Sequence, residues 1–222
     1  MANKNKTAVW FVSNCVDGSN VKNRMRISEE MLKNGLKLDR FGKCFHRQLD
    51  KRSKKDFHEF LQHYKFYLAF ENSLHCRDYI TEKFSINSLA AGLLPVVYGP
   101  VRENYEAIAP PHSFIHVEDF NSSKDLVDYL NYLDRNDSAY AEYFAWRDKD
   151  AKSLFPYGKY MGFCALCRSL FGISIEDKRS FEEIYGKNGF KYSSGSGIKF
   201  NHTIRSIHDW WLGNETKECL SV

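Results

Sequence analysis

The stretch that decides the fold is YKFYLAFENSLHCRDYITEKF, residues 64–84. Within it, Phe66–Phe70 is almost wholly apolar and predicts a buried strand. A short polar turn follows, and Asp78–Lys83 predicts the start of a helix that extends from Tyr79 to Ala91 and ends at Gly92. An apolar strand that passes through a polar turn into a helix is the repeating unit of parallel α/β sheets.

The same alternation continues on both sides of this stretch. Strands are predicted at Thr7–Ser13, Leu36–Phe41, Phe66–Phe70, Leu94–Tyr98 and Ser113–Val117. Helices are predicted at Arg24–Lys33, Ser53–Tyr64, Tyr79–Ala91, Val101–Ile108 (short), Ser122 or Ser123 to Leu133, Ala139–Trp146 and Tyr157–Phe171. Near-continuous apolar strands that alternate with amphipathic helices indicate a doubly wound parallel sheet of the Rossmann-like α/β class.

We therefore predict a Rossmann-like domain over residues 6–171 and a C-terminal tail over residues 172–222. The tail is predicted to contain a flexible Gly/Ser loop at 193–197, and Ile204–Trp211 to dock back on the domain. The net charge of +4 is modest and the basic residues are spread along the 222-residue chain, which does not indicate a nucleic-acid partner. No apolar run approaches the roughly 20 residues of a membrane span, and the first residues lack the apolar core of a signal peptide.

The six cysteines leave two interpretations open, buried thiols or a disulfide set formed in an oxidising compartment. Five Asn-x-Ser/Thr triplets fit a luminal protein, although such triplets also arise by chance; they begin at Asn5, Asn121, Asn136, Asn201 and Asn214. Cys164 and Cys167 form a C-x-x-C, but without a second such pair or a close histidine pair they do not predict a zinc site.

Polar side chains gather where ligands bind in doubly wound folds, at the carboxyl ends of the strands. Lys83, Arg24 and the unpaired N–H groups of a helix start suit a diphosphate. Glu82 could accept hydrogen bonds from a ribose diol, and Asn72 and Tyr79 can both donate and accept. Taken singly, each side chain has an ordinary structural explanation, and no glycine-rich phosphate loop is present. Glu71, directly after the strand, fits a structural carboxylate.

The order and spacing of these segments resemble the α1,3-fucosyltransferase family. The matching strings are YKFYLAFENS (64–73), DYITEKF (78–84), GLLPVVYG (92–99), SFIHVEDF (113–120), YFAWR (143–147), FCALC (163–167), VWFVSNC (9–15) and LDRFGKC (38–44). Asp209-Trp210-Trp211 and Cys219 look most like the invertebrate and plant branch, which fucosylates the N-glycan core.

The resemblance implies a GT-B-type, inverting transferase that moves L-fucose from GDP-fucose to an N-acetylglucosamine hydroxyl in α1,3 linkage. By position, Arg24 and Lys83 would stabilise the diphosphate leaving group. Asn72, Tyr79 and Glu82 would contact the ribose, phosphate or fucose, and Glu71 would support the motif. The resemblance implies no tightly bound cofactor and no protein-bound metal, although members are often stimulated by Mn²⁺.

In this family the general base lies in an N-terminal, acceptor-binding domain, which follows a stem and a membrane anchor. None of these is found in the 222 residues, so we expect the chain to be the donor half of a luminal enzyme of the Golgi membrane. We also expect little or no transfer by this chain alone. The alternative function is a truncated, catalytically incompetent nucleotide-sugar-binding module.

Overall fold

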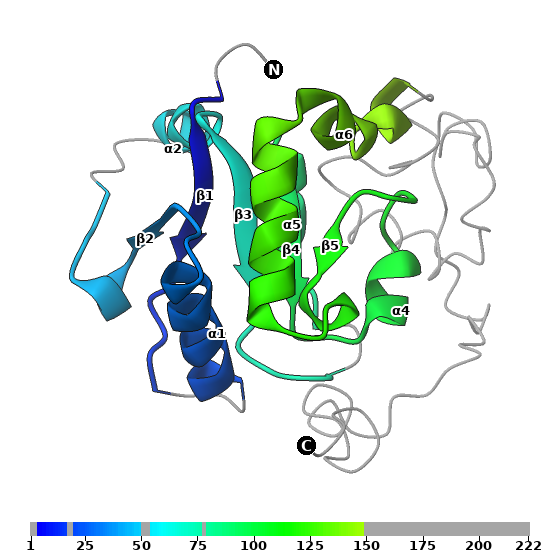
Figure 1. Cartoon of the computed structure of the whole chain (residues 1–222). Helices are drawn as coiled ribbons and strands as arrows, with labels where there is room; N and C mark the ends of the chain where they lie inside the picture. The colour runs from blue at the N-terminus through cyan, green and yellow to red at the C-terminus, as the bar shows by residue number, and fades with distance from the viewer. Residues whose placement is uncertain (1–3, 17–19, 50–53, 77–78, 149–222) are drawn as a thin grey trace, which may run out of the picture. The chain divides into compact units, whose positions relative to one another are not determined.

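The computed structural model describes residues 4–16, 20–49, 54–76 and 79–148 (Figure 1). Its sheet has five strands in the order β2-β1-β3-β4-β5, and every neighbouring pair is parallel. The strands are β1 (Lys6–Phe11), β2 (Leu38–Phe41), β3 (Tyr64–Phe70), β4 (Leu94–Tyr98) and β5 (Ile115–His116). The chain moves outward from β1 to β2 and then crosses back to β3, so the strand order reverses beside β1.

Helices follow the strands in the predicted alternation. The α-helices are α1 (Val21–Lys33), α2 (Lys54–Leu61), α3 (Glu82–Phe84), α4 (Arg102–Glu106), α5 (Ser123–Arg135) and α6 (Asp137–Glu142). Shorter 3₁₀ turns are η1 (Lys43–Phe45), η3 (Val117–Asp119) and η4 (Ala145–Asp148), and η2 (Ser85–Leu89) is a π turn. In Figure 1, α1 and α5 lie side by side in front of the sheet and α2 lies behind it.

Successive side chains of β1 point to opposite faces of the sheet. Trp10 is fully buried against Phe45 and Phe70 in the core that lies under α1 and α5. Its neighbour Phe11 points to the other face, where its ring stacks on Phe41 and meets Phe57 of α2 edge-on. Each large side chain contributes about 1.5–3 kcal/mol by leaving water, and covering both faces explains why β3 is buried along its whole length.

The local sequence of helix α5 explains where the helix begins and which of its sides is buried. The Ser122 hydroxyl caps it by accepting the Asp125 backbone N–H at 3.1 Å, a contact that typically contributes about 1 kcal/mol. Apolar side chains on one side of the helix are buried in the core; they are Leu126, Val127, Leu130 and Leu133.

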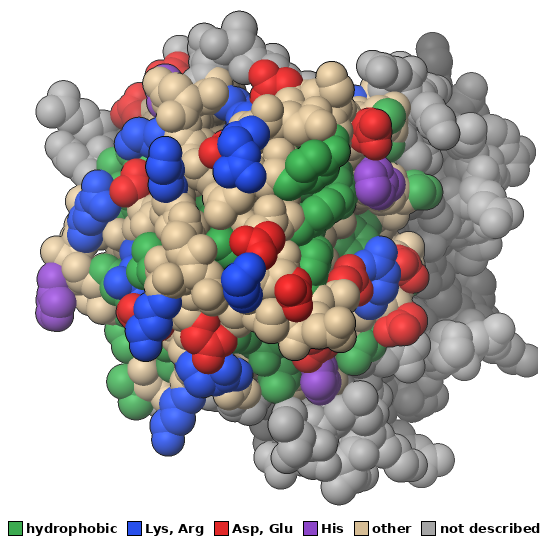
Figure 2. Space-filling model, in the orientation of Figure 1, with side chains coloured by type: hydrophobic (Ala, Val, Ile, Leu, Met, Phe, Trp, Pro, Cys, Tyr) green, Lys and Arg blue, Asp and Glu red, His purple; other side chains and the backbone are tan. Residues whose placement is uncertain are grey.

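On the face of the molecule seen in Figure 2, basic and acidic side chains are interspersed.

The helix predicted over residues 79–91 is the main correction. Tyr79 lies outside any helix, Thr81 is extended, and only Glu82–Phe84 is α-helical before the π turn. The fully buried Ser88 hydroxyl donates to the carbonyl oxygens of Lys83, at 2.9 Å, and of Phe84. Such side-chain bonds compete with the regular helical ladder, and here the ladder widens into a π turn.

Other boundaries differ by a few residues. Helix α2 ends at Leu61 rather than Tyr64, because Tyr64 already belongs to β3. Strand β5 is only Ile115–His116, because the 3₁₀ turn η3 begins at Val117. The predicted helix at Tyr157–Phe171, the boundary at 171/172 and the tail lie outside the described residues and stay predictions.

Disulfide bonding, rather than buried thiols, is what the described cysteines show. Cys15, after β1, is bonded to Cys44 in η1, with their Cα atoms 5.6 Å apart. Cys76 is disulfide-bonded as well. Among the helices that the structure describes, none is both long and apolar enough to cross a membrane.

Candidate functional site

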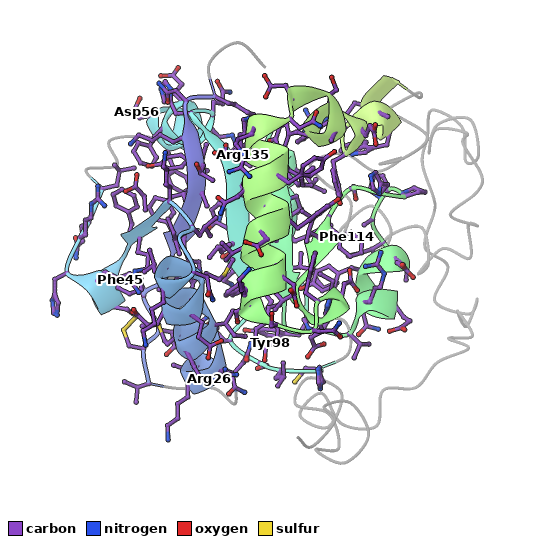
Figure 3. The ribbon with its side chains drawn as sticks, viewed as in Figure 1. Arg26, Phe45, Asp56, Tyr98, Phe114 and Arg135 are labelled. Atoms are coloured by element: carbon purple, nitrogen blue, oxygen red, sulfur yellow. A yellow bond between two sulfur atoms is a disulfide. The ribbon has the colours of Figure 1, made fainter. Side chains whose placement is uncertain are left out.

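The start of α1 and the residues that follow β3 meet at the carboxyl edge of the sheet. The backbone N–H of Asn20 donates to the Asn72 carbonyl at 3.0 Å, and its side-chain amide donates to the Glu71 carbonyl at 3.1 Å. Tyr98, at the end of β4, marks the same edge in Figure 3. The topology therefore brings together segments that the sequence separates by about fifty residues.

Arg24 links three of these segments from the inside. It is 1% exposed, and one nitrogen of its fork donates to the Phe70 carbonyl at 3.2 Å and to the Asn72 side chain at 2.6 Å. The other donates to the Asn14 carbonyl at 2.6 Å, while Nε has no partner among the described residues. Burial lowers the pKa of Arg24, and Glu71 acts in the opposite direction. Arg24 thus holds the site together and shows a ligand little surface.

Glu71 organises the turn that leads into α3. Its carboxylate has no exposed surface and accepts the backbone N–H of Thr81 at 2.9 Å and the Thr81 hydroxyl at 2.8 Å. The Lys83 ammonium donates to the same carboxylate at 2.9 Å and lies 2.8 Å from the Thr81 hydroxyl. The supporting role predicted for Glu71 agrees with this position, and Lys83 keeps 15% of its side chain exposed.

The other predicted residues lie nearer the surface, around the pair of Glu71 and Lys83. Tyr79 is 36% exposed, the Glu82 side chain is 56% exposed, and Asn72 is half-buried. The Glu82 carboxylate lies 3.7 Å from the Lys83 ammonium. Lys83, Glu82, Tyr79 and Asn72 thus remain accessible to a ligand at this edge, whereas Arg24 and Glu71 form the frame behind them.

Gly99 is required by close packing against Glu71. Its φ is +150°, and a Cβ at this position would lie 2.7 Å from the Glu71 Cβ and 3.2 Å from its Cγ. The Gly99 carbonyl also accepts the backbone N–H of His75 at 2.7 Å. The sequence showed Gly99 only as the end of a strand.

Sequence reasoning missed a second layer of contacts. The His75 ring lies 2.9 Å from the Glu118 carboxylate, which joins the loop after β3 to η3. The Arg102 guanidinium pairs with Glu106 at 2.8 Å and with Asp119. Thr81 could have been found as part of the DYITEK string. Nothing in the local sequence signals that His75 meets Glu118, because they are 43 positions apart.

No group of three or more potential metal ligands occurs in the described part of the chain. The cations and carboxylates at the carboxyl edge are bonded mostly to one another, which leaves no oxygen-rich cluster for a divalent ion.

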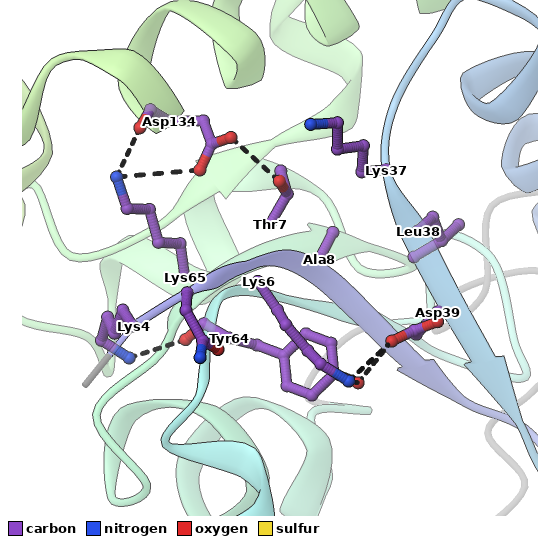
Figure 4. Close-up of a pocket in the computed structure, with 11 residues that line it drawn as sticks. Lys4, Lys6, Thr7, Ala8, Lys37, Leu38, Asp39, Tyr64, Lys65 and Asp134 are labelled. Carbon is purple, nitrogen blue, oxygen red and sulfur yellow. Dashed lines mark hydrogen bonds and ion pairs between the residues drawn. The ribbon is translucent and has the colours of Figure 1, made fainter.

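A separate groove of about 440 Å³ lies at the opposite, amino edge of the sheet (Figure 4). Its polar lining includes Lys4, Lys6, Lys37, Lys65, Asp39, Tyr64 and Asp134. The Lys4 ammonium donates to the Tyr64 carbonyl at 2.6 Å, and that of Lys65 donates to the Asp134 carbonyl in the last turn of α5. The carboxyl end of a helix carries partial negative charge, which suits Lys65, and Lys4 is bonded to the backbone of β3, so we interpret these two lysines as structural. Burial, with Arg147 and Lys65 nearby, lowers the pKa of Lys4 to about 8.

Comparison with known proteins bears on the carboxyl edge. Residues 1–186 match the family model described as glycosyltransferase family 10 (fucosyltransferase) C-term. The chain belongs to this family. The family prediction from the sequence is therefore confirmed, as is the doubly wound parallel α/β fold of GT-B type.

Individual relatives agree. The chain is 44% identical over 146 residues to glycoprotein 3-alpha-L-fucosyltransferase A of Drosophila melanogaster, covering 65% of this chain and 28% of the relative. It is 44% identical over 167 residues to the human 3-galactosyl-N-acetylglucosaminide 4-alpha-L-fucosyltransferase FUT3, covering 75% and 43%. A solved α1,3-fucosyltransferase with GDP-fucose superposes with a TM-score of 0.51 at 26% identity, covering 63% of this chain and 38% of that one. The chain spans less than half the length of the relatives it matches.

Proposed function

We propose that this chain is the GDP-fucose-binding half of a fucosyltransferase that transfers L-fucose, with inversion, to an N-acetylglucosamine hydroxyl of a protein-linked glycan in α1,3 linkage. The observation that carries the proposal is the Lys83–Glu71–Thr81 arrangement at the carboxyl end of β3, in a chain of this family. The solved relative that holds GDP-fucose supports the choice of donor.

The accessible residues are proposed to bind the donor, GDP-fucose. The Lys83 ammonium donates to Glu71 at 2.9 Å and to the Thr81 hydroxyl at 2.8 Å and remains partly exposed, so its third N–H group can meet a diphosphate oxygen. Glu82 and Tyr79 stand at the surface beside it and are proposed to contact the ribose or the fucose. Arg24 is proposed to act on the diphosphate chiefly by holding Asn72 in place.

The chemical step is proposed to depend on charge stabilisation. Departure of GDP leaves an oxocarbenium-like fucosyl centre and builds negative charge on the diphosphate, which Lys83 stabilises. Inversion requires attack by the acceptor hydroxyl from the opposite side, with a general base to take its proton. We propose that this base belongs to the acceptor-binding part of the longer relatives. Mn²⁺ would act, if at all, on the GDP leaving group rather than at a protein site.

A calorimetric titration with GDP-fucose tests the donor site. We expect saturable 1:1 binding that Lys83→Ala weakens at least tenfold and that Lys33→Ala, an exposed control on α1, leaves unchanged. Because Lys83→Ala leaves the buried Glu71 carboxylate unpaired, the double variant Glu71→Gln with Lys83→Met provides a neutral pair. The double variant is expected to fold and still to bind weakly. Wild-type affinity in either variant would refute the role of Lys83.

Activity distinguishes the transferase from the alternative, a binding module without catalysis. The chain covers only part of each relative named above, and this partial coverage is the observation that favours the alternative. Radiolabelled fucose transfer to an N-glycan acceptor is expected when the chain is joined to the acceptor-binding domain of a relative, and not from the 222-residue chain by itself. Binding without transfer by both would favour the module. We also propose a luminal, Golgi-membrane location for the protein, which the Cys15–Cys44 disulfide supports.

A further inference from the structure

Asn121 begins the triplet Asn121-Ser122-Ser123, which has the form of an N-glycosylation acceptor. The residue is exposed, and its side-chain amide makes no hydrogen bond within the part of the chain that the structure describes. It lies in the connection between η3 and α5, one residue before the helix cap. Asn121 is therefore open to solvent among the described residues, and an attached glycan would displace none of their hydrogen bonds.

The two serines of the triplet hold this connection in place. The Ser122 hydroxyl caps α5 by accepting the Asp125 backbone N–H at 3.1 Å. The Ser123 hydroxyl donates to the Glu30 carboxylate of α1 at 2.6 Å. A glycan on Asn121 would thus start from a fixed point beside two packed helices.

The other described triplets are less open. The Asn136 side chain caps α6 by accepting the Ala139 N–H at 3.1 Å, and its amide donates to the Tyr132 hydroxyl at 3.0 Å. The hydroxyl residue of the Asn5 triplet, Thr7, is buried, whereas Ser123, at the same place in the Asn121 triplet, is half-buried; both hydroxyls are bonded to carboxylates. The triplets at Asn201 and Asn214 lie outside the described residues. Asn121 is therefore the described acceptor that a glycan would disturb least.

The disulfide between Cys15 and Cys44 adds an independent observation. Disulfides persist in the oxidising lumen of the secretory pathway, where N-glycans are also added. We propose that Asn121 carries an N-linked glycan. Its Nδ2 forms a bond to the anomeric carbon of a lipid-diphosphate-linked oligosaccharide, the bond from that carbon to the diphosphate oxygen breaks with its electron pair on the departing lipid diphosphate, and the proton lost by the amide neutralises one charge of that leaving group.

Mass spectrometry of the protein produced in the secretory pathway of insect cells tests this proposal. We expect a glycopeptide that contains Asn121, and Asn121→Gln should lower the intact mass by one glycan. Asn34→Gln, an exposed asparagine outside any triplet, should keep the wild-type mass. Ser123→Thr preserves the acceptor pattern and should keep the glycan.

Ser122→Ala separates the acceptor from the helix cap, because Asn-Ala-Ser is still an acceptor. This variant should keep the glycan and lower the midpoint of thermal unfolding, whereas Asn121→Gln should lose the glycan and keep the midpoint. An unmodified Asn121 peptide from folded, secreted protein would overturn the proposal. So would an unchanged mass in Asn121→Gln. Neither result depends on fucosyl transfer or on donor binding.

Discussion

The Lys83 ammonium lies 2.9 Å from the carboxylate of Glu71, a side chain with no exposed surface. The pair joins the end of β3 to the first turn of α3 across eleven intervening residues. Removing one partner of a buried pair leaves an uncompensated charge. We therefore expect Glu71→Ala to lower the free energy of unfolding by about 3 kcal/mol. Urea denaturation of the single and double variants measures this.

The double variant shows whether the two residues act together. Lys83→Ala combined with Glu71→Ala should cost less than the sum of the single changes, because neither charge is left alone. Additive effects would mean that the 2.9 Å contact carries no coupling.

Arg24 provides the second prediction. Its planar fork bonds three acceptors at once, from Phe70, Asn72 and Asn14, and a lysine at this position cannot do so. Arg24→Lys should lower the free energy of unfolding by about 2 kcal/mol and weaken GDP-fucose binding. Arg26→Lys is the control, since Arg26 is an exposed residue of the same helix. Equal effects of the two changes would contradict a special role for Arg24.

Gly99 tests the packing behind the site. Gly99→Ala places a Cβ against Glu71, and we expect a loss of about 1–3 kcal/mol of stability together with weaker donor binding. Gly35 is the matched control, because it also has a positive φ, of +92°, but nothing lies within 4 Å of a Cβ there. Thermal unfolding and calorimetry of both variants separate backbone strain from the contact. Similar donor affinity in both would exclude a role for the contact in binding.

Stability should also depend on Lys4 in alkaline solution. Its pKa is lowered to about 8 in the folded chain, whereas an unfolded lysine titrates near 10.4. Between these values the unfolded state binds more protons, so this residue makes the free energy of unfolding rise with pH. Below about pH 8 the cost of holding a charged Lys4 is fully present. Lys4→Met should flatten the profile from pH 8 to 10.5 relative to Lys33→Met. An unchanged slope would show that Lys4 titrates normally.

The disulfide gives the fifth prediction. Cys15 and Cys44 are 29 positions apart, and closing a loop of this size stabilises a fold by about 3–4 kcal/mol in the chain-entropy model. The double variant Cys15→Ser with Cys44→Ser should unfold at a lower urea concentration, and added reductant should shift the wild-type chain at least as far, because it also breaks the disulfide of Cys76. Insensitivity to reductant would contradict the bond.

Much of the fold could be predicted because its signals are local. The apolar run of β3 and the capped, amphipathic α5 carry their information in neighbouring residues. The helix at 79–91 was wrong for two reasons: the Glu71 carboxylate, ten positions before Thr81, bonds the Thr81 backbone N–H, and the Ser88 hydroxyl bonds carbonyls of its own turn. The apolar pattern of the segment shows neither bond.

The sequence predicted which residues would gather at this edge, but not how they are arranged there. Residue type and the family strings placed Lys83, Glu82 and Arg24 at one edge, as the topology also does. The sequence could not show that Arg24 is buried behind the site, because its acceptors are mainly backbone carbonyls, one at the end of β3 and one in the loop after β1. Backbone acceptors leave no trace in residue identity.

The Cys15–Cys44 bond has a practical consequence for making the protein. β2 is an edge strand, joined to β1 through four register pairs, from Ala8–Leu38 to Phe11–Phe41. A chain produced in a reducing bacterial cytoplasm would hold this corner by noncovalent contacts alone, among them these pairs and the bond from the Cys44 N–H to the Val12 carbonyl, next to the Asn14 carbonyl that receives Arg24. In such material β3 to β5 would keep their secondary structure, and a circular dichroism spectrum would still show a folded chain, although the hydrogen bonds of Arg24 at this corner are lost. Failure to bind donor would then reflect the redox history of the preparation, so an oxidising expression host is the appropriate source.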